Sequence, residues 1–329
     1  MPSPKSASPN SRASEAGRYR GLESIRRVGV VGAGLIGGGW VAAFLGRGYD
    51  VSVQDPSPGT EARLRAQVAA AWPALESLGL AAGASPDRLT FHTSLTMALE
   101  GADFVQENAP ERPEVKAALY AQLGDVLPAD VIIASSTSGL PVSLLQRDCR
   151  HPQRCVLGHP FNPVHLMPLV ELGGGEQTDP AAIDTATSFY VAMGKEPVRL
   201  DREIVGHIAN RLTSAMFREA VSLVAGGYAT VADVDRAIRF GPALKWAVQG
   251  QFTTFHTGGG DAGMEGFLRH FAPGIMNRWR TMADPDLADP DLQAKLTAQV
   301  AEANGHRPVA DIARQQDAMV LRLLQALAE

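Results

Sequence analysis

The strongest indication of the fold is a ten-residue stretch near the N-terminus, Val28-Gly29-Val30-Val31-Gly32-Ala33-Gly34-Leu35-Ile36-Gly37. A short apolar strand runs into a Gly-x-Gly-x-x-Gly turn that begins a helix, which is the context that a dinucleotide-binding turn requires. Gly32 permits the tight turn, Gly34 lets a pyrophosphate approach the backbone, and Gly37 lets helix and strand pack closely. The helix N-terminus then favours the phosphate charge. The predicted cofactor contacts here are Gly32, Gly34, Leu35, Ile36 and Gly37.

An acidic residue follows the second expected strand. Asp55 lies 18 residues after Gly37, where a carboxylate accepts hydrogen bonds from the adenosine ribose hydroxyls. A carboxylate there repels a 2′-phosphate, and no arginine follows it in Asp55-Pro56-Ser57-Pro58. The sequence therefore predicts NAD rather than NADP as the cofactor.

Length and composition set the class of protein. The chain has 329 residues, 45% of them hydrophobic and 20% charged, which suits a globular protein of two domains. The net charge of -5 and the lack of a basic stripe argue against a nucleic-acid partner. Cys149 and Cys155 show no metal-binding spacing, and we expect both to be buried and free, with no metal site.

The N-terminus has the composition of a disordered tail. Residues 1–24 are rich in Ser, Pro and Arg and lack the apolar core of a signal peptide, with a mitochondrial presequence as the alternative. No run approaches the roughly 18 apolar residues that a membrane helix needs. We expect a cytoplasmic protein without membrane contact.

The periodicity of apolar residues divides the rest into two domains. Residues 25–202 alternate short apolar runs with amphipathic helices, which predicts an α/β, mostly parallel Rossmann-type sheet. Residues 203–329 predict an all-helical domain, beginning with a mostly buried helix that stops at Gly226-Gly227 and ending with a polar helix near Val309–Leu327. The expected strands are Val28–Val31, Val51–Val53, Leu89–His92, Phe104–Glu107, Val131–Ala134, Cys155–Gly158, Leu169–Leu172 and Pro197–Leu200. The expected helices of the first domain are Gly37–Arg47, Gly59–Leu78, Pro113–Val126 and Pro180–Met193.

A histidine and a glutamate follow successive strands in the second half of the first domain. His159 comes just past one strand end, and Glu171 ends the next strand, twelve residues later. An imidazole suits the removal of a hydroxyl proton near neutral pH, and a carboxylate on its second nitrogen would fix the tautomer. Each residue alone is more often structural, so the hypothesis depends on their order and spacing.

Further polar residues follow neighbouring strand ends. Ser138 and Asn210 are candidate catalytic and substrate-binding groups, and Asn162 is a candidate substrate contact. Ala109, Glu111 and Lys116 follow the fourth expected strand and, with Ser138, are candidate cofactor contacts at the nicotinamide half.

The set resembles the L-3-hydroxyacyl-CoA dehydrogenase family from about Arg26 to Met282. The matching segments are Val-Gly-Ala-Gly-Leu-Ile-Gly, Glu-Asn-Ala-Pro-Glu-Arg, Ser-Ser-Thr-Ser-Gly, Gly-His-Pro-Phe-Asn-Pro, Pro-Leu-Val-Glu and Ile-Ala-Asn-Arg. The resemblance implies a Rossmann-type domain with NAD, a helical domain that forms a homodimer, a catalytic pair at His159 and Glu171, and substrate contacts at Ser138 and Asn210. His207 departs from the pattern, because an aromatic residue is usual after the preceding Gly206.

Within that family, the chain most resembles enzymes that oxidise the 3-hydroxyl of L-carnitine to the 3-keto acid. The helix after the second strand offers only Arg63 and Arg65 for CoA phosphates, and Trp246, Phe252 and Phe255 are candidates for binding a quaternary ammonium group. L-Gulonate, a 3-hydroxyacyl-CoA, and a crystallin-like NAD-binding protein without turnover stay open as alternatives.

Overall fold

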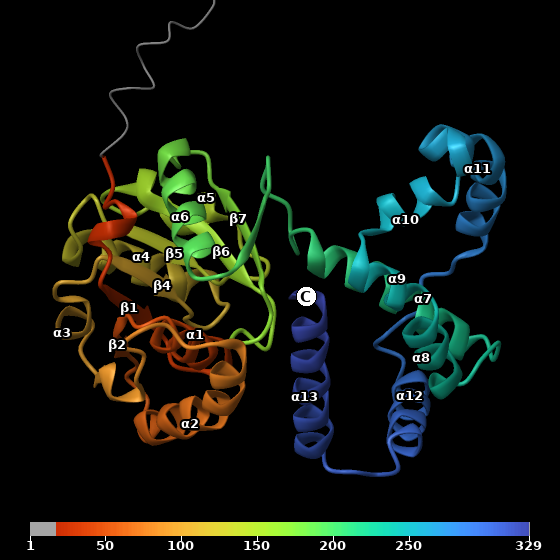
Figure 1. The fold of residues 1–329 in the computed structure, drawn as a ribbon, viewed down its shortest axis with the longest axis horizontal. Helices are drawn as coiled ribbons and strands as arrows, with labels where there is room; N and C mark the ends of the chain where they lie inside the picture. The colour runs from red at the N-terminus through yellow and green to blue at the C-terminus, as the bar shows by residue number, and fades with distance from the viewer. Residues whose placement is uncertain (1–17, 329) are drawn as a thin grey trace, which may run out of the picture. The chain divides into compact units, whose positions relative to one another are not determined.

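A computed structural model describes residues 18–328 and contains two compact units, residues 1–208 and 209–329. The predicted boundary at 202/203 lies six residues before the one observed. The predicted tail at residues 1–17 lies outside the described residues. Figure 1 shows the two units, which we describe separately.

The first unit is built on one eight-stranded sheet in the order β3-β2-β1-β4-β5-β6-β7-β8. All neighbouring strands pair in parallel except β6 and β7, which are antiparallel, so the predicted mostly parallel Rossmann-type sheet is confirmed. The strands are β1 Arg27–Val31, β2 Asp50–Gln54, β3 Leu89–His92, β4 Phe104–Glu107, β5 Ile132–Ser135, β6 Cys155–Pro160, β7 Leu169–Gly174 and β8 Glu196–Arg199.

Helices cover both faces of this sheet. The helices α1 (Leu35–Gly46), α2 (Thr60–Leu78) and α6 (Pro180–Ala192) contribute to one buried cluster, in which Trp40 stacks on Phe44. The helices α3 (Leu95–Leu99), α4 (Pro113–Val126) and α5 (Val142–Gln146) contribute to the other, which includes both free cysteines. The short helices α3 and α5 were not predicted, because five residues carry too little periodicity to be recognised.

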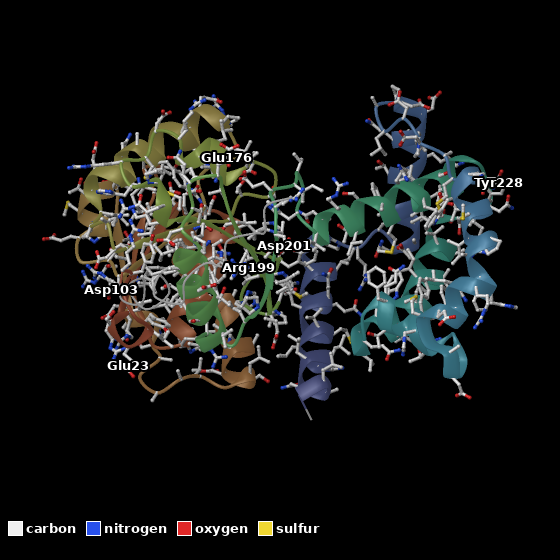
Figure 2. The ribbon with its side chains drawn as sticks, turned by 90° about the horizontal axis from the view of Figure 1, so that it is seen from above. Glu23, Asp103, Glu176, Arg199, Asp201 and Tyr228 are labelled. Atoms are coloured by element: carbon white, nitrogen blue, oxygen red, sulfur yellow. The ribbon has the colours of Figure 1, made fainter. Side chains whose placement is uncertain are left out.

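Residues 18–24, predicted as part of the tail, pack against the first unit. The Tyr19 hydroxyl donates to Asp179 Oδ2 at 3.1 Å and its ring is buried, while Arg20 pairs with Asp103 and Asp130. Asp103, labelled in Figure 2, also accepts the backbone N–H of Arg26 at 2.8 Å. These partners lie at least 77 positions away in the sequence, so local composition did not reveal them.

The second unit is helical, as predicted. Its helices are α7 Ala209–Ala225, α8 Val231–Phe240, α9 Pro242–Val248, α10 Gln251–Thr257, α11 Gly263–Thr281, α12 Pro290–Ala303 and α13 Val309–Ala328. The predicted stop of α7 is confirmed, since Gly227 has a φ of 72°. The Lys295 ammonium of α12 caps the same helix end by donating to Val224 O at 2.7 Å.

The prediction that α7 is mostly buried is wrong. Only Val221 and Val224 of this helix are buried, and Leu212 and Phe217 are 61% and 56% exposed. The apolar stripe exists, but within one chain little packs on its first half. The predicted polar helix at the C-terminus, α13, also carries a partly exposed apolar row at Met319, Leu323 and Leu327. No helix in the described part of the chain is long and apolar enough to span a bilayer.

Candidate active site

The glycine turn leaves open space at the N-terminus of α1. Gly32 has a φ of 84°, and a Cβ there would lie 2.6 Å from Asn108 O. A Cβ on Gly37 would lie 1.9 Å from Gly32 O, so only glycine allows helix and turn to approach this closely. A Cβ on Gly34 would have no heavy atom within 4 Å. The turn therefore fits a pyrophosphate against Gly34 and the first N–H groups of α1.

Asp55 lies beside this turn, immediately after β2. Its Oδ2 accepts the Ala33 N–H at 2.9 Å, and its Oδ1 accepts the Ser57 N–H at 2.9 Å. Two backbone donors thus fix the half-buried carboxylate next to the glycine turn. The carboxylate could accept the adenosine ribose hydroxyls of NAD from this position, and that contact stays a prediction.

His159 and Glu171 are opposite each other in the antiparallel β6–β7 ladder. His159 Nδ1 lies 2.8 Å from Glu171 Oε2, and the residues are 6% and 1% exposed. An ionised carboxylate only accepts, so Nδ1 carries the proton and Nε2 keeps a lone pair. The other carboxylate oxygen, Oε1, accepts the Ile208 N–H at 2.7 Å. The arrangement is that of an oriented imidazole base.

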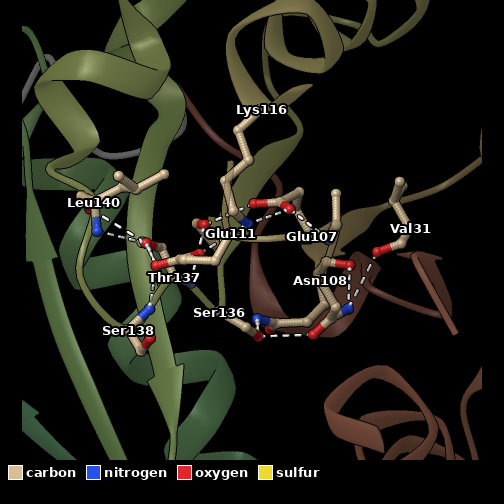
Figure 3. Close-up of polar contacts among 12 residues, drawn as sticks. Val31, Glu107, Asn108, Glu111, Lys116, Ser136, Thr137, Ser138 and Leu140 are labelled. Carbon is tan, nitrogen blue, oxygen red and sulfur yellow. Dashed lines mark hydrogen bonds and ion pairs between the residues drawn. The ribbon is translucent and has the colours of Figure 1, made fainter. Parts of the chain in front are cut away.

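Glu111 holds the loop that carries Ser138 (Figure 3). Its Oε1 accepts the Thr137 hydroxyl at 2.6 Å and the N–H groups of Ser138 and Gly139, each at 2.9 Å. Burial alone would raise the pKa of Glu111, but the Thr137 hydrogen bond, the Lys116 charge and the two amides outweigh it and lower the pKa below its ordinary value. Glu111 therefore binds the loop as a carboxylate.

Several predicted site residues of the first unit border one cavity of about 300 Å³. Ser138 and His159 both line it, so the Ser138 loop and the base face the same space. Six of the lining residues were predicted from the sequence and three were not. The lining residues are Ile36, Asn108, Ala109, Glu111, Lys116, Ser136, Ser138, His159 and Pro160.

Lys116 is part of a buried ion pair at the edge of this cavity. Its ammonium lies 2.6 Å from Glu107 Oε1 and 3.6 Å from Glu111 Oε2, and the side chain is 1% exposed. Ser135 donates its hydroxyl to the second oxygen of Glu107 at 2.6 Å. Lys116 thus supports the two glutamates, and its contact with the nicotinamide stays a prediction.

A buried polar network behind the cavity was not predicted. The Gln106 amide donates to Ser136 Oγ at 2.9 Å and to Gly158 O at 3.1 Å, and Tyr190 donates its hydroxyl to the same amide. Ser136 in turn donates to Asn108 Oδ1 at 2.7 Å. A glutamine inside the apolar strand β4 is the one signal that could have revealed this network.

The remaining predicted residues lie elsewhere. Asn162 is exposed and does not line the cavity. Asn210 lies in the first turn of α7, in the second unit. The aromatic residues of that unit differ in environment, since Phe252 is 82% exposed, whereas the Phe255 ring stacks on Phe267 with 4.6 Å between centroids. Trp246 is half-buried on α9. Their contacts with a substrate stay predictions.

Comparison with known proteins decides the family. Residues 27–204 match the NAD-binding domain of 3-hydroxyacyl-CoA dehydrogenases, and residues 206–302 match their C-terminal domain. The chain belongs to the 3-hydroxyacyl-CoA dehydrogenase family. It is therefore an NAD-dependent oxidoreductase, and the resemblance, the fold and the cofactor expected from the sequence are confirmed.

Several relatives of the chain share one activity. It is 49% identical to an L-carnitine dehydrogenase of Streptomyces griseus, over 92% of this chain and 90% of the relative. It is 45% identical to an L-carnitine dehydrogenase of Pseudomonas putida, over 93% of this chain and 95% of the relative. Among solved structures, an NAD-dependent dehydrogenase of a substituted pyridine carboxylic acid matches with a TM-score of 0.79 at 26% identity, covering 92% of this chain and 99% of that one.

Proposed function

We propose that this member of the 3-hydroxyacyl-CoA dehydrogenase family oxidises the 3-hydroxyl of L-carnitine to the ketone, with NAD as the oxidant. The observation that carries the proposal is the 43–49% identity to L-carnitine dehydrogenases of several bacteria over more than nine tenths of the chain. The oriented His159–Glu171 pair beside the glycine turn supplies the chemistry that such a reaction needs.

NAD, which the glycine turn from Gly32 to Gly37 and Asp55 would hold, would supply the acceptor for the hydride of the substrate carbon. His159 Nε2 takes the proton of the 3-hydroxyl, and Glu171 stabilises the charge that appears on the imidazole. The Ser138 hydroxyl, at the same cavity, orients the substrate oxygen towards His159. Asn210 is the proposed second donor to that oxygen.

The basic groups of α2 favour a substrate without CoA. Arg65 pairs with Glu61 one turn away at 2.9 Å, and Arg63 donates to the Thr60 hydroxyl at 2.7 Å. Both guanidinium groups are therefore engaged within α2 and its first turn. A CoA ester would have to displace these contacts in order to pair its phosphates.

Turnover against a set of alcohols tests the proposal. We expect NADH formation with L-carnitine, and much slower formation with L-gulonate, L-3-hydroxybutyrate and its CoA ester. Turnover of one of the other three without turnover of L-carnitine would contradict the proposed substrate and leave the reaction class intact. Failure with all four would contradict the function itself.

The aromatic residues of the second unit test recognition of the trimethylammonium group. A cation over a desolvated ring gains about 2 kcal/mol, close to 30-fold in affinity. Trp246→Ala should therefore raise KM for L-carnitine more than tenfold, and should change KM for L-3-hydroxybutyrate little. Phe252 is 82% exposed, so Phe252→Ala should raise KM for L-carnitine only about two- to fivefold. Phe267→Ala serves as the control for packing, because this buried and stacked ring should affect thermal stability more than KM. Equal changes in KM for both alcohols would contradict this role.

We propose that the enzyme is a homodimer formed through the helical unit. The exposed first half of α7 borders an apolar groove of about 260 Å³ between α7, α8 and α12, and Phe217 lines it. A second copy of the chain is the proposed occupant. Phe217→Glu should reduce the mass measured by light scattering to that of one chain, whereas Arg218→Gln, on the next position of the helix, should not. A wild-type mass of one chain would contradict the dimer.

We also propose the cytoplasm as the location of the enzyme. Both cysteines are buried and unbonded, which suits a reducing compartment. Recovery of the enzyme with the membrane or secreted fraction of its cells would contradict this location.

A further inference from the structure

A second histidine lies against the proposed catalytic pair. His207 is 5% exposed, and its ring centroid is 4.9 Å from that of His159, with 53° between the ring planes. Its Nε2 lies 2.9 Å from Thr137 O. A carbonyl only accepts, so Nε2 carries a proton and donates a hydrogen bond to the carbonyl of Thr137, the residue that precedes Ser138.

The backbone around His207 is held in an uncommon conformation. Gly206 and His207 have φ values of 79° and 48°, and a residue other than glycine seldom adopts a positive φ. The next residue, Ile208, donates its N–H to Glu171 Oε1 at 2.7 Å. Three consecutive residues thus contact two parts of the site, through the His207 ring on the Ser138 loop and through the Ile208 amide on Glu171.

We propose that His207 is a positioning residue, which ties the Ser138 loop to the His159–Glu171 pair through its hydrogen bond to Thr137 O. This inference rests on the proposed function, because it assigns Ser138 to the substrate. Glu111 holds the same loop by accepting three of its donors. With both partners in place, the Ser138 hydroxyl keeps a fixed distance from His159 across the cavity.

The proposed reaction favours a neutral His207 ring, because a second cation beside His159 would oppose the positive charge that His159 gains during the reaction. Burial is the main cause that lowers the pKa of His207, and His159 lowers it further, against the Thr137 hydrogen bond and the charges of Glu171 and Glu111. Arg202 and Glu203 line a separate small cavity that the ring also borders. The balance favours the neutral Nε2–H form.

Three substitutions separate the hydrogen bond from the ring and the backbone. His207→Phe keeps the ring without the donor, and His207→Gln keeps a donor near the position of Nε2. His207→Asn tolerates a positive φ, but its amide ends nearer the position of Nδ1. We expect kcat/KM for the alcohol to fall about tenfold or more in the Phe and Asn variants. The Gln variant should recover to within about threefold of wild type, while the Kd for NAD and the thermal midpoint change little in all three.

The opposite pattern would overturn the proposal. If the His207→Phe variant keeps activity and the His207→Gln variant does not, the ring packs beside the site and its hydrogen bond has no positioning role. If all three variants equal wild type, His207 has no part in the reaction. Loss of activity that follows the thermal midpoint would identify a structural role alone.

A measurement without substrate keeps this test separate from the proposed function. In the ¹⁵N-labelled protein, the His207 ring, identified by its loss in the Gln variant, should show the neutral Nε2–H tautomer at pH 6. A neutral ring with its proton on Nδ1, which leaves no donor at Nε2, would overturn the inference. Absence of turnover by the wild-type enzyme would instead contradict the proposed function, and the tautomer would still decide the role of His207.

Discussion

At the scale of single residues, carboxylates organise this site by accepting several donors at once. Asp55 accepts two backbone amides, Glu111 accepts a hydroxyl and two amides, and Glu171 accepts an imidazole and an amide. Hydrogen bonds to an ionised group are worth about 1.5–3 kcal/mol each, roughly twice those between neutral groups. Each carboxylate therefore fixes a loop as well as contributing charge.

Asp55 should set the preference for NAD. In Asp55→Ala we expect kcat/KM with NAD to fall by about tenfold or more, since hydrogen bonds to a charged group are lost. The value with NADP should fall less or rise, because repulsion of the 2′-phosphate is removed. Steady-state kinetics with both cofactors measures this. Equal efficiency of the wild-type enzyme with the two cofactors would show that Asp55 does not meet the ribose.

His159 and Glu171 should affect turnover and not cofactor affinity. His159→Asn should lower kcat by about 10²–10⁴-fold, because the base is lost. Glu171→Gln should cost less, because the imidazole stays while its tautomer is no longer fixed. The Kd for NAD, measured by calorimetry, should stay within about threefold of wild type, since the pair acts on the alcohol. A wild-type kcat in the His159→Asn enzyme would contradict the proposed role of His159 as the base.

The role of a site residue could be predicted only where the order of residues along the sequence indicates which side chains meet. His159 and Glu171 lie in the adjacent strands β6 and β7, which are consecutive in the sequence, so their meeting was predictable. His207 and Gln106 were not predicted as site residues, because their partners lie 70 and 84 positions away on other elements. Apart from the polar Gln106 within the apolar strand β4, nothing local in the sequence indicates such a contact.

At the scale of elements, the turn between β6 and β7 is fixed by a lysine from outside it. Lys195 follows α6 and is 8% exposed. Its ammonium donates to Val164 O at 2.5 Å and Met167 O at 2.9 Å, and lies 5.4 Å from the centre of the Trp40 ring. The segment directly after the His159 strand is thereby attached to the core of the first unit.

The stability supplied by Lys195 should depend on pH. Burial, with a smaller effect of Arg47, lowers its pKa from 10.5 to about 7. Between these values the unfolded chain binds more protons than the folded one, so stability rises with pH. The unfolding free energy of wild type relative to Lys195→Met should therefore rise between pH 6 and pH 9, on the order of 2 kcal/mol. Urea titrations at the two pH values measure this, and a difference that is flat or falls would show that the ammonium is not desolvated.

Elements were predictable to the extent that they bury a regular face. The strands β3 and β4 and the helix α4 have their predicted bounds, because apolar runs and an initial proline mark them. In contrast, the glycine-rich segment after α8 contains α9, α10 and α11, which the sequence did not resolve. Short helices with exposed apolar residues give no clear period.

At the scale of the whole molecule, the two units have separate interiors. Both large apolar clusters belong to the first unit, whereas the buried apolar residues of the second are few. Composition and periodicity predicted the two architectures, but the boundary and the α7 surface depend on packing that composition does not encode. The exposed face of α7 is a feature of this kind for which the prediction was wrong.

On heating, the two units should unfold in separate transitions. NAD binds the first unit only in the folded state, so it should raise the midpoint of that unit by mass action, by about 2.7 kcal/mol of stability at 100 times Kd. We expect calorimetry to show two transitions, of which NAD shifts one. The other should shift with protein concentration if the helical unit is dimeric. A single transition that NAD moves as a whole would contradict this independence.

The antiparallel pairing of β6 with β7 also has a kinetic consequence. His159 lies in β6, a fully buried strand of the eight-stranded sheet, and Glu171 is its direct partner on the neighbouring strand β7. Neither residue lies on a loop. Amide protons in such a strand exchange with solvent only through openings as large as the cooperative unit that contains it. The backbone that carries the pair should thus show some of the slowest exchange in the chain, while the Ser138 loop exchanges sooner. Local fluctuations would then change how a substrate is held, and the acid–base pair would separate only when the sheet unfolds.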